Sequence, residues 1–133
     1  MLEKRIEIRW RDLDAYGHVN NAVYLTYLEE ARDAWVHQVL GKVADTWDFV
    51  LARVAIDYKH ELVQDDGAIL VRCGLGSIGR GSIRTREEIV KLDGTVSAVA
   101  ESVIVPRDPS DGRSRPLTDE ERSALEGELQ AEG

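Results

Sequence analysis

One long helical pattern, followed by an unbroken series of strand patterns, limits the fold more than any other feature of this sequence. Between residues 21 and 40, apolar side chains recur at three- and four-residue spacing, which predicts an amphipathic helix of about five turns. Asn20 or Asn21 can cap its start, and Gly41 is predicted to end it in a left-handed conformation. The apolar stripe consists of Tyr24, Tyr27, Leu28, Ala31, Trp35 and Val39.

The remaining patterns predict strands. One strand with a single solvent-exposed face precedes the helix, and four strands follow it. Turn-forming residues at 65–67, 79–81 and 93–94 separate these four strands. The later four strands can pair as an antiparallel meander. Because helices do not alternate with strands, the pattern argues against a doubly wound nucleotide-binding sheet and predicts an α+β fold with one sheet curled around the helix. The strand patterns cover residues 4–10, 49–58, 69–75, 82–91 and 96–105.

The chain length of 133 residues favours a single domain. The folded core is expected to end near Val105. We assign residues 1–117 to the domain and residues 118–133 to an acidic C-terminal extension with a short helix. The formal net charge is −8, and the extension holds six acidic residues and one basic residue. Such a chain is not expected to bind nucleic acid or an anionic membrane through general electrostatics.

The cysteine and histidine content argues against a disulfide framework and a metal site. Cys73 is the only cysteine, and it occupies an apolar-alternating strand position where a buried, inert thiol is expected. The histidines, His18, His37 and His60, show no compact metal-binding spacing. No apolar stretch reaches the length of a membrane span or resembles a signal sequence. We therefore expect a cytoplasmic protein without a metal site.

The densest cluster of polar functional groups, DLDAYGHVNN at residues 12–21, lies directly before the helix. A helix N-terminus offers free backbone N–H groups and a partial positive charge, which suit a carbonyl oxygen that becomes anionic in a transition state. A nearby carboxylate could then attack or activate water. The simpler interpretation is that these residues only cap a turn and the helix. A calcium loop is excluded because Val23 occupies the position of the bidentate glutamate.

This segment, together with LTYLEEAR at residues 25–32, resembles the signature of hotdog-fold acyl-CoA thioesterases, and the nearest pattern is the 4-hydroxybenzoyl-CoA thioesterase group. The resemblance covers residues 4–125. It implies a five-stranded antiparallel sheet wrapped around one long helix, and subunits that join their sheets edge to edge as a homodimer or homotetramer, with active sites at the subunit interface. It also implies hydrolysis of an acyl-CoA without a cofactor, with coenzyme A present only as part of the substrate.

The resemblance also assigns roles within the segment. Asp14 resembles the family's catalytic carboxylate, acting as nucleophile or as general base, and Asp12 is the weaker candidate. The backbone N–H of Asn21 falls where the family polarises the thioester carbonyl. His18 matches a version of the motif that plant acyl-ACP thioesterases share, Asp-x-x-x-His-Val-Asn-Asn, and could position substrate or water. A purely structural histidine is the alternative.

Residues around the motif supply candidates for substrate binding. The aromatic ones border the site and could line an acyl pocket, although Tyr24 also belongs to the apolar stripe. Residues 74–79 spell GxGxxG, but a strand follows them, so they are interpreted as a strand end, bulge and turn. The resemblance implies that coenzyme A phosphates lie near the arginines after this turn. The candidates are Tyr16, Asn20, Tyr24, Arg80 and Arg84.

Three alternatives stay open. Glu29 and Glu30 lie where a related thioesterase subfamily has its catalytic carboxylate, but a solvated or ion-paired helix face is the preferred interpretation of these acids and of Arg32 and Asp33. An acyl-ACP thioesterase would use the same fold, and basic residues such as Arg80 and Arg84 would suit its acidic carrier. A non-catalytic hotdog domain that binds an acyl-CoA would not need a carboxylate before the helix.

Overall fold

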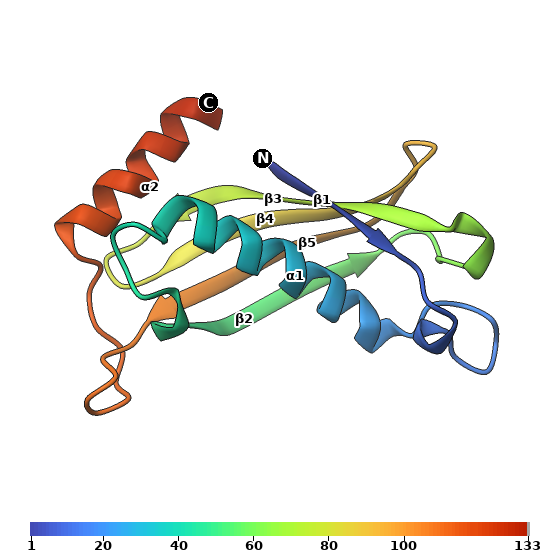
Figure 1. Ribbon diagram of the computed structural model, residues 1–133, viewed down its shortest axis with the longest axis horizontal. Coiled ribbons are helices and arrows are strands. Elements are labelled where there is room, and N and C mark those ends of the chain that lie inside the picture. Colours follow the sequence, from blue (N-terminus) through green and yellow to red (C-terminus); the bar gives the residue numbers. More distant parts are fainter. Residues whose placement is uncertain (133) are drawn as a thin grey trace.

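The computed structural model describes residues 1–132 and confirms the predicted five-stranded antiparallel sheet around one long helix (Figure 1). The helix α1 (Asn21–Leu40) lies across one face of the sheet, and α2 (Asp119–Glu132) lies near one end of it. The strands are β1 (Leu2–Glu7), β2 (Phe49–Tyr58), β3 (Ala68–Ile78), β4 (Ile83–Lys91) and β5 (Val96–Pro106). Three short 3-10 helices, η1 (Trp10–Asp12), η2 (Thr46–Asp48) and η3 (Gln64–Asp66), lie in the connections.

The strand order β1-β3-β4-β5-β2 corrects the predicted four-stranded meander. The strands β3, β4 and β5 do form successive hairpins, and Gly94 turns the last one with a φ of 93°. However, β2 pairs with β5, because the other edge of β3 is already occupied by β1. Within the described residues, β1 and β2 are therefore the edges of the sheet, and each has one side without a strand partner.

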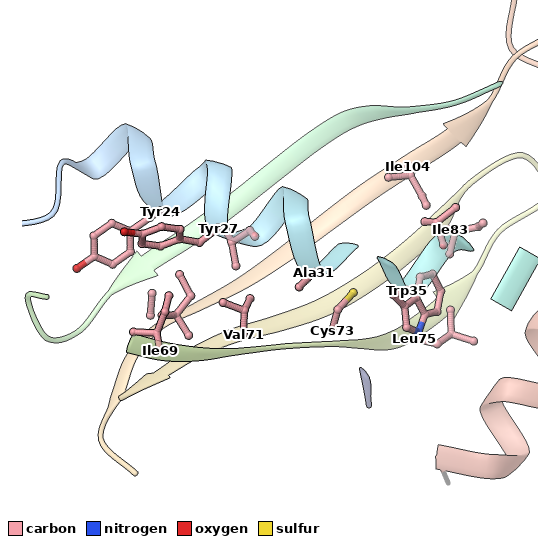
Figure 2. Packing of buried hydrophobic residues seen from close by; sticks show 14 of the residues in the cluster. Tyr24, Tyr27, Ala31, Trp35, Ile69, Val71, Cys73, Leu75, Ile83 and Ile104 are labelled. Atoms are coloured by element: carbon pink, nitrogen blue, oxygen red, sulfur yellow. The ribbon is translucent and has the colours of Figure 1, made fainter. Parts of the chain in front are cut away.

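The apolar stripe of α1 packs against the core-facing side chains of β3, and this contact fixes the helix on the sheet (Figure 2). Tyr27, Ala31 and Trp35 are at most 1% exposed. Along the strand below them lie Val71 and Cys73, which are completely buried. Each large apolar side chain removed from water contributes about 1.5–3 kcal/mol. Burial also raises the pKa of the Cys73 thiol, which confirms the expected inert cysteine.

Arg32 does not lie on the exposed helix face predicted for it. The side chain is buried, and its Nη1 donates to Glu87 Oε2 of β4 at 2.9 Å and to Ser102 Oγ of β5 at 3.1 Å. Spacing alone cannot show this, because a long side chain beside the stripe can reach inward when the sheet supplies an opposite charge. The three neighbouring acids of the helix are exposed, as predicted.

Two predictions about where elements end are wrong. Gly41 is right-handed, with φ −62° and ψ −21°, and its N–H donates to His37 O at 3.0 Å, so the chain leaves the helix without a left-handed residue. The folded core does not end near Val105, because Leu125 of α2 is completely buried. The acidic composition of the C-terminal segment conceals the few apolar residues that hold it against the body of the protein.

The edge strand β2 departs from simple alternation. Val54 and Ile56 are half-buried as predicted, but the pairing with β5 shifts between Leu51 and Arg53. The Gly-rich segment of residues 74–79 is confirmed as a strand end with a register shift, followed by a turn in which Gly79 N–H donates to Ser82 O at 2.8 Å. Among residues 1–132, no helix combines the length and apolar character that crossing a membrane requires.

Candidate active site

The loop between β1 and α1 folds into a tight turn that holds the Asp14 carboxylate in place. The Asp14 N–H donates to His18 O at 2.7 Å, and Gly17 permits the turn with a φ of 84°. Asp14 Oδ1 accepts hydrogen bonds from the backbone N–H groups of Tyr16, at 2.8 Å, and His18, at 3.2 Å. No residue between 1 and 132 donates to Oδ2. The turn therefore holds Oδ1 and leaves Oδ2 without a donor from the described residues.

The start of α1 provides a backbone donor next to this turn. Asn20 is the N-cap residue, and its Oδ1 accepts from Ala22 N–H at 2.9 Å, which confirms the predicted cap. Asn21 is the first residue of the helix, and no hydrogen bond from its N–H is found among residues 1–132. The first turn contains no acidic side chain that would offset the partial positive charge of the helix.

A pocket of about 190 Å³ brings the loop, the helix start and the end of β2 together. His18 Nε2 lies 3.1 Å from Glu61 Oε2, and both side chains are partly exposed. The hydroxyl of Tyr58 donates to the backbone carbonyl of Asn21 at 3.0 Å, which ties β2 to the helix start. The residues that line the pocket are Asp14, His18, Val19, Asn21, Tyr24, Tyr58, Lys59, His60 and Glu61.

Two tyrosines join the wall of this pocket to the core. Tyr24 and Tyr58 meet edge to face, with ring centroids 5.0 Å apart. Burial raises the pKa of Tyr58, and the nearby Tyr24 adds to this effect. The hydroxyl of Tyr24 also accepts a hydrogen bond from Leu62 N–H at 3.1 Å. Tyr24 is thus a buried core residue whose polar end braces the chain that follows β2.

Asp12, unlike Asp14, has both carboxylate oxygens engaged in hydrogen bonds within the protein. It is 2% exposed, and Oδ2 accepts from Arg9 N–H at 3.0 Å and from the Tyr27 hydroxyl at 2.8 Å. Arg9 Nη2 donates to Oδ1 at 3.0 Å. Burial alone would raise the pKa of Asp12, but the hydrogen bonds from Arg9 and Tyr27 outweigh it and the net pKa is lowered. This carboxylate anchors the loop to the second turn of α1.

The other predicted substrate residues lie away from the pocket. Tyr16 is 85% exposed and does not line it. Arg80 lies in the turn between β3 and β4, and the Arg84 guanidinium pairs with Glu101. Along β4, Arg84 is about 20 Å from Val90, the residue that pairs with the start of β5. Within this chain, the two arginines are therefore at the far end of the sheet from Asp14.

Sequence reasoning missed two residues of this pocket, Tyr58 and Glu61. The end of β2 reaches the β1–α1 loop only through tertiary pairing, in which His18 bridges Val63 and Val19 N–H donates to Leu62 O at 2.8 Å. The one available signal was the polar cluster at Lys59 and His60 directly after a strand. No group of three or more potential metal-ligating side chains is found within the described residues.

Comparisons with known proteins identify relatives of this chain. Residues 8–125 match the family model described as Thioesterase-like superfamily. The chain is 30% identical over 136 residues to the long-chain acyl-CoA thioesterase FadM of Escherichia coli strain K12, covering 96% of this chain and 93% of that protein.

Solved structures show the same similarity over the whole fold. A thioesterase from Thermus thermophilus, complexed with coenzyme A and Zn, superposes with a TM-score of 0.83 at 32% identity, covering 94% of this chain and 92% of that one. A predicted thioesterase from Bacillus stearothermophilus superposes with a TM-score of 0.84 at 27% identity, covering 95% and 94% of the two chains.

Proposed function

The chain belongs to the thioesterase-like superfamily and is a thioester hydrolase of hotdog fold, and from this premise we propose that it cleaves acyl-CoA with Asp14 as the catalytic carboxylate. The products would be a carboxylic acid and free coenzyme A. The observation that carries the proposal is the shared pocket of Asp14 and the first residue of α1. The reaction proposed needs a carboxylate, a backbone donor and water, so it calls on no cofactor.

Asp14 Oδ2 is the reacting atom in this proposal. As a general base, it takes a proton from water while the water oxygen attacks the thioester carbon; the C–S bond then breaks, and the thiolate of coenzyme A takes up a proton. As a nucleophile, the same oxygen attacks the thioester carbon directly, the C–S bond breaks, and the thiolate of coenzyme A leaves and takes up a proton; water then hydrolyses the resulting anhydride and restores the Asp14 carboxylate. Both routes need Oδ2 unoccupied and Oδ1 held, which the two backbone hydrogen bonds to Oδ1 support.

The Asn21 N–H is proposed to bind the thioester carbonyl oxygen. That oxygen becomes negatively charged in the tetrahedral transition state, and a fixed donor at the positive end of a helix stabilises the charge without rearrangement. The absence of an acidic side chain from the first turn supports this role. The amide side chain of Asn21 has no part in the step.

His18 is proposed to orient substrate or water, with Glu61 holding the ring. The pairing of Nε2 with Glu61 leaves Nδ1 available for a second hydrogen bond in the pocket. This makes Glu61 a positioning residue. We expect Glu61→Gln, which keeps the shape, to lower kcat less than His18→Ala.

A homodimer through the free edge of β2 is proposed to complete the site. Leu51 is 45% exposed and Trp47 is 91% exposed, so an apolar surface accompanies that edge. A two-fold axis that pairs the two β2 strands antiparallel would bring the far end of the partner's sheet toward this Asp14 pocket. Arg80 and Arg84 of the partner subunit could then contact the coenzyme A phosphates. Light scattering should give about twice the 14.9 kDa mass of one chain.

The test is thiol release from aromatic, short-chain and long-chain acyl-CoAs by wild type and Asp14→Asn. Asparagine keeps the shape and removes the reactive charge, so we expect kcat to fall about 10²–10⁴-fold. Asp65→Asn, in an exposed turn outside the pocket, is the matched control and should retain activity. Equal rates in wild type and a folded Asp14→Asn protein would refute the role of Asp14. Turnover of acyl carrier protein thioesters alone would identify the other substrate class.

A further inference from the structure

A buried ion pair lies between α1 and the sheet, outside the pocket that holds Asp14. Arg32 is 5% exposed and Glu87 is 3% exposed, and Arg32 Nη1 lies 2.9 Å from Glu87 Oε2. Ser102 Oγ donates to the other carboxylate oxygen of Glu87. The cost of removing two charges from water often exceeds their mutual attraction, so stability alone does not account for such a pair in an apolar core.

The guanidinium of Arg32 has donors left over. Its hydrogen bonds to Glu87 and Ser102 both use Nη1, and neither Nε nor Nη2 donates to any residue between 1 and 132. Arg32 lines a pocket of about 250 Å³ between α1 and β2, whose other walls include Leu25, Leu51 and Val54. A cation with free donors thus borders a mainly apolar pocket.

A second buried polar group, on β4, also lacks a hydrogen-bond partner. Thr85 Oγ1 is buried and makes no hydrogen bond, and Thr85 lies directly opposite Ser102 in the pairing of β4 with β5. Ser102 in turn lies opposite Val54, which lines the pocket. Thr85 itself does not line the pocket, so the Nε and Nη2 donors of Arg32, which does line it, are the groups that a ligand in the pocket could contact.

The two pockets follow one another along the same pair of elements. Tyr58 lines the Asp14 pocket and Val54 lines the Arg32 pocket, four residues apart on β2, which corresponds to about 13 Å. On α1, Arg32 comes eleven residues after Asn21, a rise of about 16 Å, and helical side chains lean back toward the N-terminus. An extended chain advances about 1.2 Å per bond, so about ten to twelve carbons would span the interval.

We propose that Arg32 donates a hydrogen bond to an oxygen atom near the distal end of the acyl group, and thereby selects chains of about ten to twelve carbons that carry a hydroxyl or carbonyl group there. This inference rests on the proposed function. The oxygen is a neutral one, because Glu87 balances the charge of Arg32 and the exposed Glu29 lines the same pocket. A plain alkyl end would displace water from the free donors without replacing its hydrogen bonds.

The acyl chain in this arrangement runs over the exposed edge of the Tyr58 ring, which is 46% exposed, and along the side of β2 that faces α1. Pairing of two β2 edges, as proposed above, would close this path from solvent. The end of the acyl chain then lies beside Arg32, next to the apolar side chains of Leu25 and Val54.

The test compares 12-hydroxydodecanoyl-CoA with dodecanoyl-CoA by thiol release. For wild type, we expect kcat/KM to favour the hydroxylated substrate by at least about tenfold. The variant Arg32→Met/Glu87→Gln removes both charges, and its glutamine still accepts from Ser102, so the fold should persist. In this variant the ratio should fall to about one or below. The control Arg72→Met, which breaks an exposed strand ion pair with Glu3, should leave the ratio unchanged.

The outcomes separate this inference from the proposed function. Equal kcat/KM values in wild type, or a preference that survives in the double variant, would overturn the role of Arg32 and leave thioester hydrolysis intact. If wild type hydrolyses neither substrate, the proposed function fails for these two acyl-CoAs. Calorimetry with free 12-hydroxydodecanoate and dodecanoate then tests the role of Arg32 separately. Tighter binding of the hydroxy acid that the double variant loses supports Arg32 as the selector, and equal binding overturns it.

Discussion

Replacing Arg32 alone with methionine should destabilise the protein far more than replacing it together with Glu87. The single change removes the 2.9 Å contact to Glu87 and leaves that carboxylate completely buried with one remaining hydrogen bond, from Ser102. Truncating one partner of a buried ion pair costs about 3–5 kcal/mol, because the other charge stays desolvated without compensation. In Arg32→Met/Glu87→Gln no buried charge is left, so we expect a loss of only about 1 kcal/mol.

Urea unfolding followed by circular dichroism measures both free energies. The slope of the unfolding free energy against urea should stay constant while the midpoint moves, because the surface exposed on unfolding is unchanged. The sum of the losses in Arg32→Met and Glu87→Gln should exceed the loss in the double variant by at least about 2 kcal/mol, as expected for groups in contact. A single-variant loss below about 1 kcal/mol would refute the reasoning, since it would mean that water reaches the Glu87 carboxylate.

Three further predictions concern the loop, its anchor and the C-terminal helix. Asp12→Asn should lower the free energy of unfolding by about 2 kcal/mol at neutral pH. In wild type, the stability that ionised Asp12 contributes is complete above about pH 5 and is lost as pH falls through its lowered pKa. The urea midpoints of the two proteins should therefore converge between about pH 6 and 2. Gly17→Ala should lower stability by about 1 kcal/mol in thermal unfolding, solely through its positive φ, because nothing lies within 4 Å of the added carbon; no change would contradict that geometry. Leu125→Ala should lower the free energy of unfolding by about 2–5 kcal/mol in the same assay, because the side chain is completely buried. A loss within about 0.5 kcal/mol, as at surface sites, would show that α2 is not part of the core.

The parts of the fold that depend on neighbouring residues could be predicted from the sequence. The spacing of apolar residues defines α1, the Asn20 cap defines its start, and the loop that presents Asp14 directly precedes it. Because the carboxylate and the backbone donor lie seven residues apart in one chain segment, their proximity needs no knowledge of tertiary pairing.

The remaining parts depend on which strand meets which element. The place of β2 at the sheet edge follows from the occupation of β3 by β1, which no local pattern encodes. Tyr58 and Glu61 enter the pocket only through that placement, and Arg32 becomes buried only because β4 presents Glu87 opposite it. Helical spacing treats a long charged side chain beside the stripe as exposed, whereas its terminal group lies several bonds away from its backbone position.

The anchoring of Asp12 has a consequence for the entropy of ligand binding. Its carboxylate joins the β1–α1 loop to the Tyr27 hydroxyl on the second turn of α1, so the loop and the helix start form one stiff body. A loop that is already ordered loses little conformational freedom when a ligand arrives, and that loss would otherwise be subtracted from the affinity. The hydrogen bonds of Asp12 thus lower the conformational entropy that the neighbouring Asp14 would lose when a ligand binds.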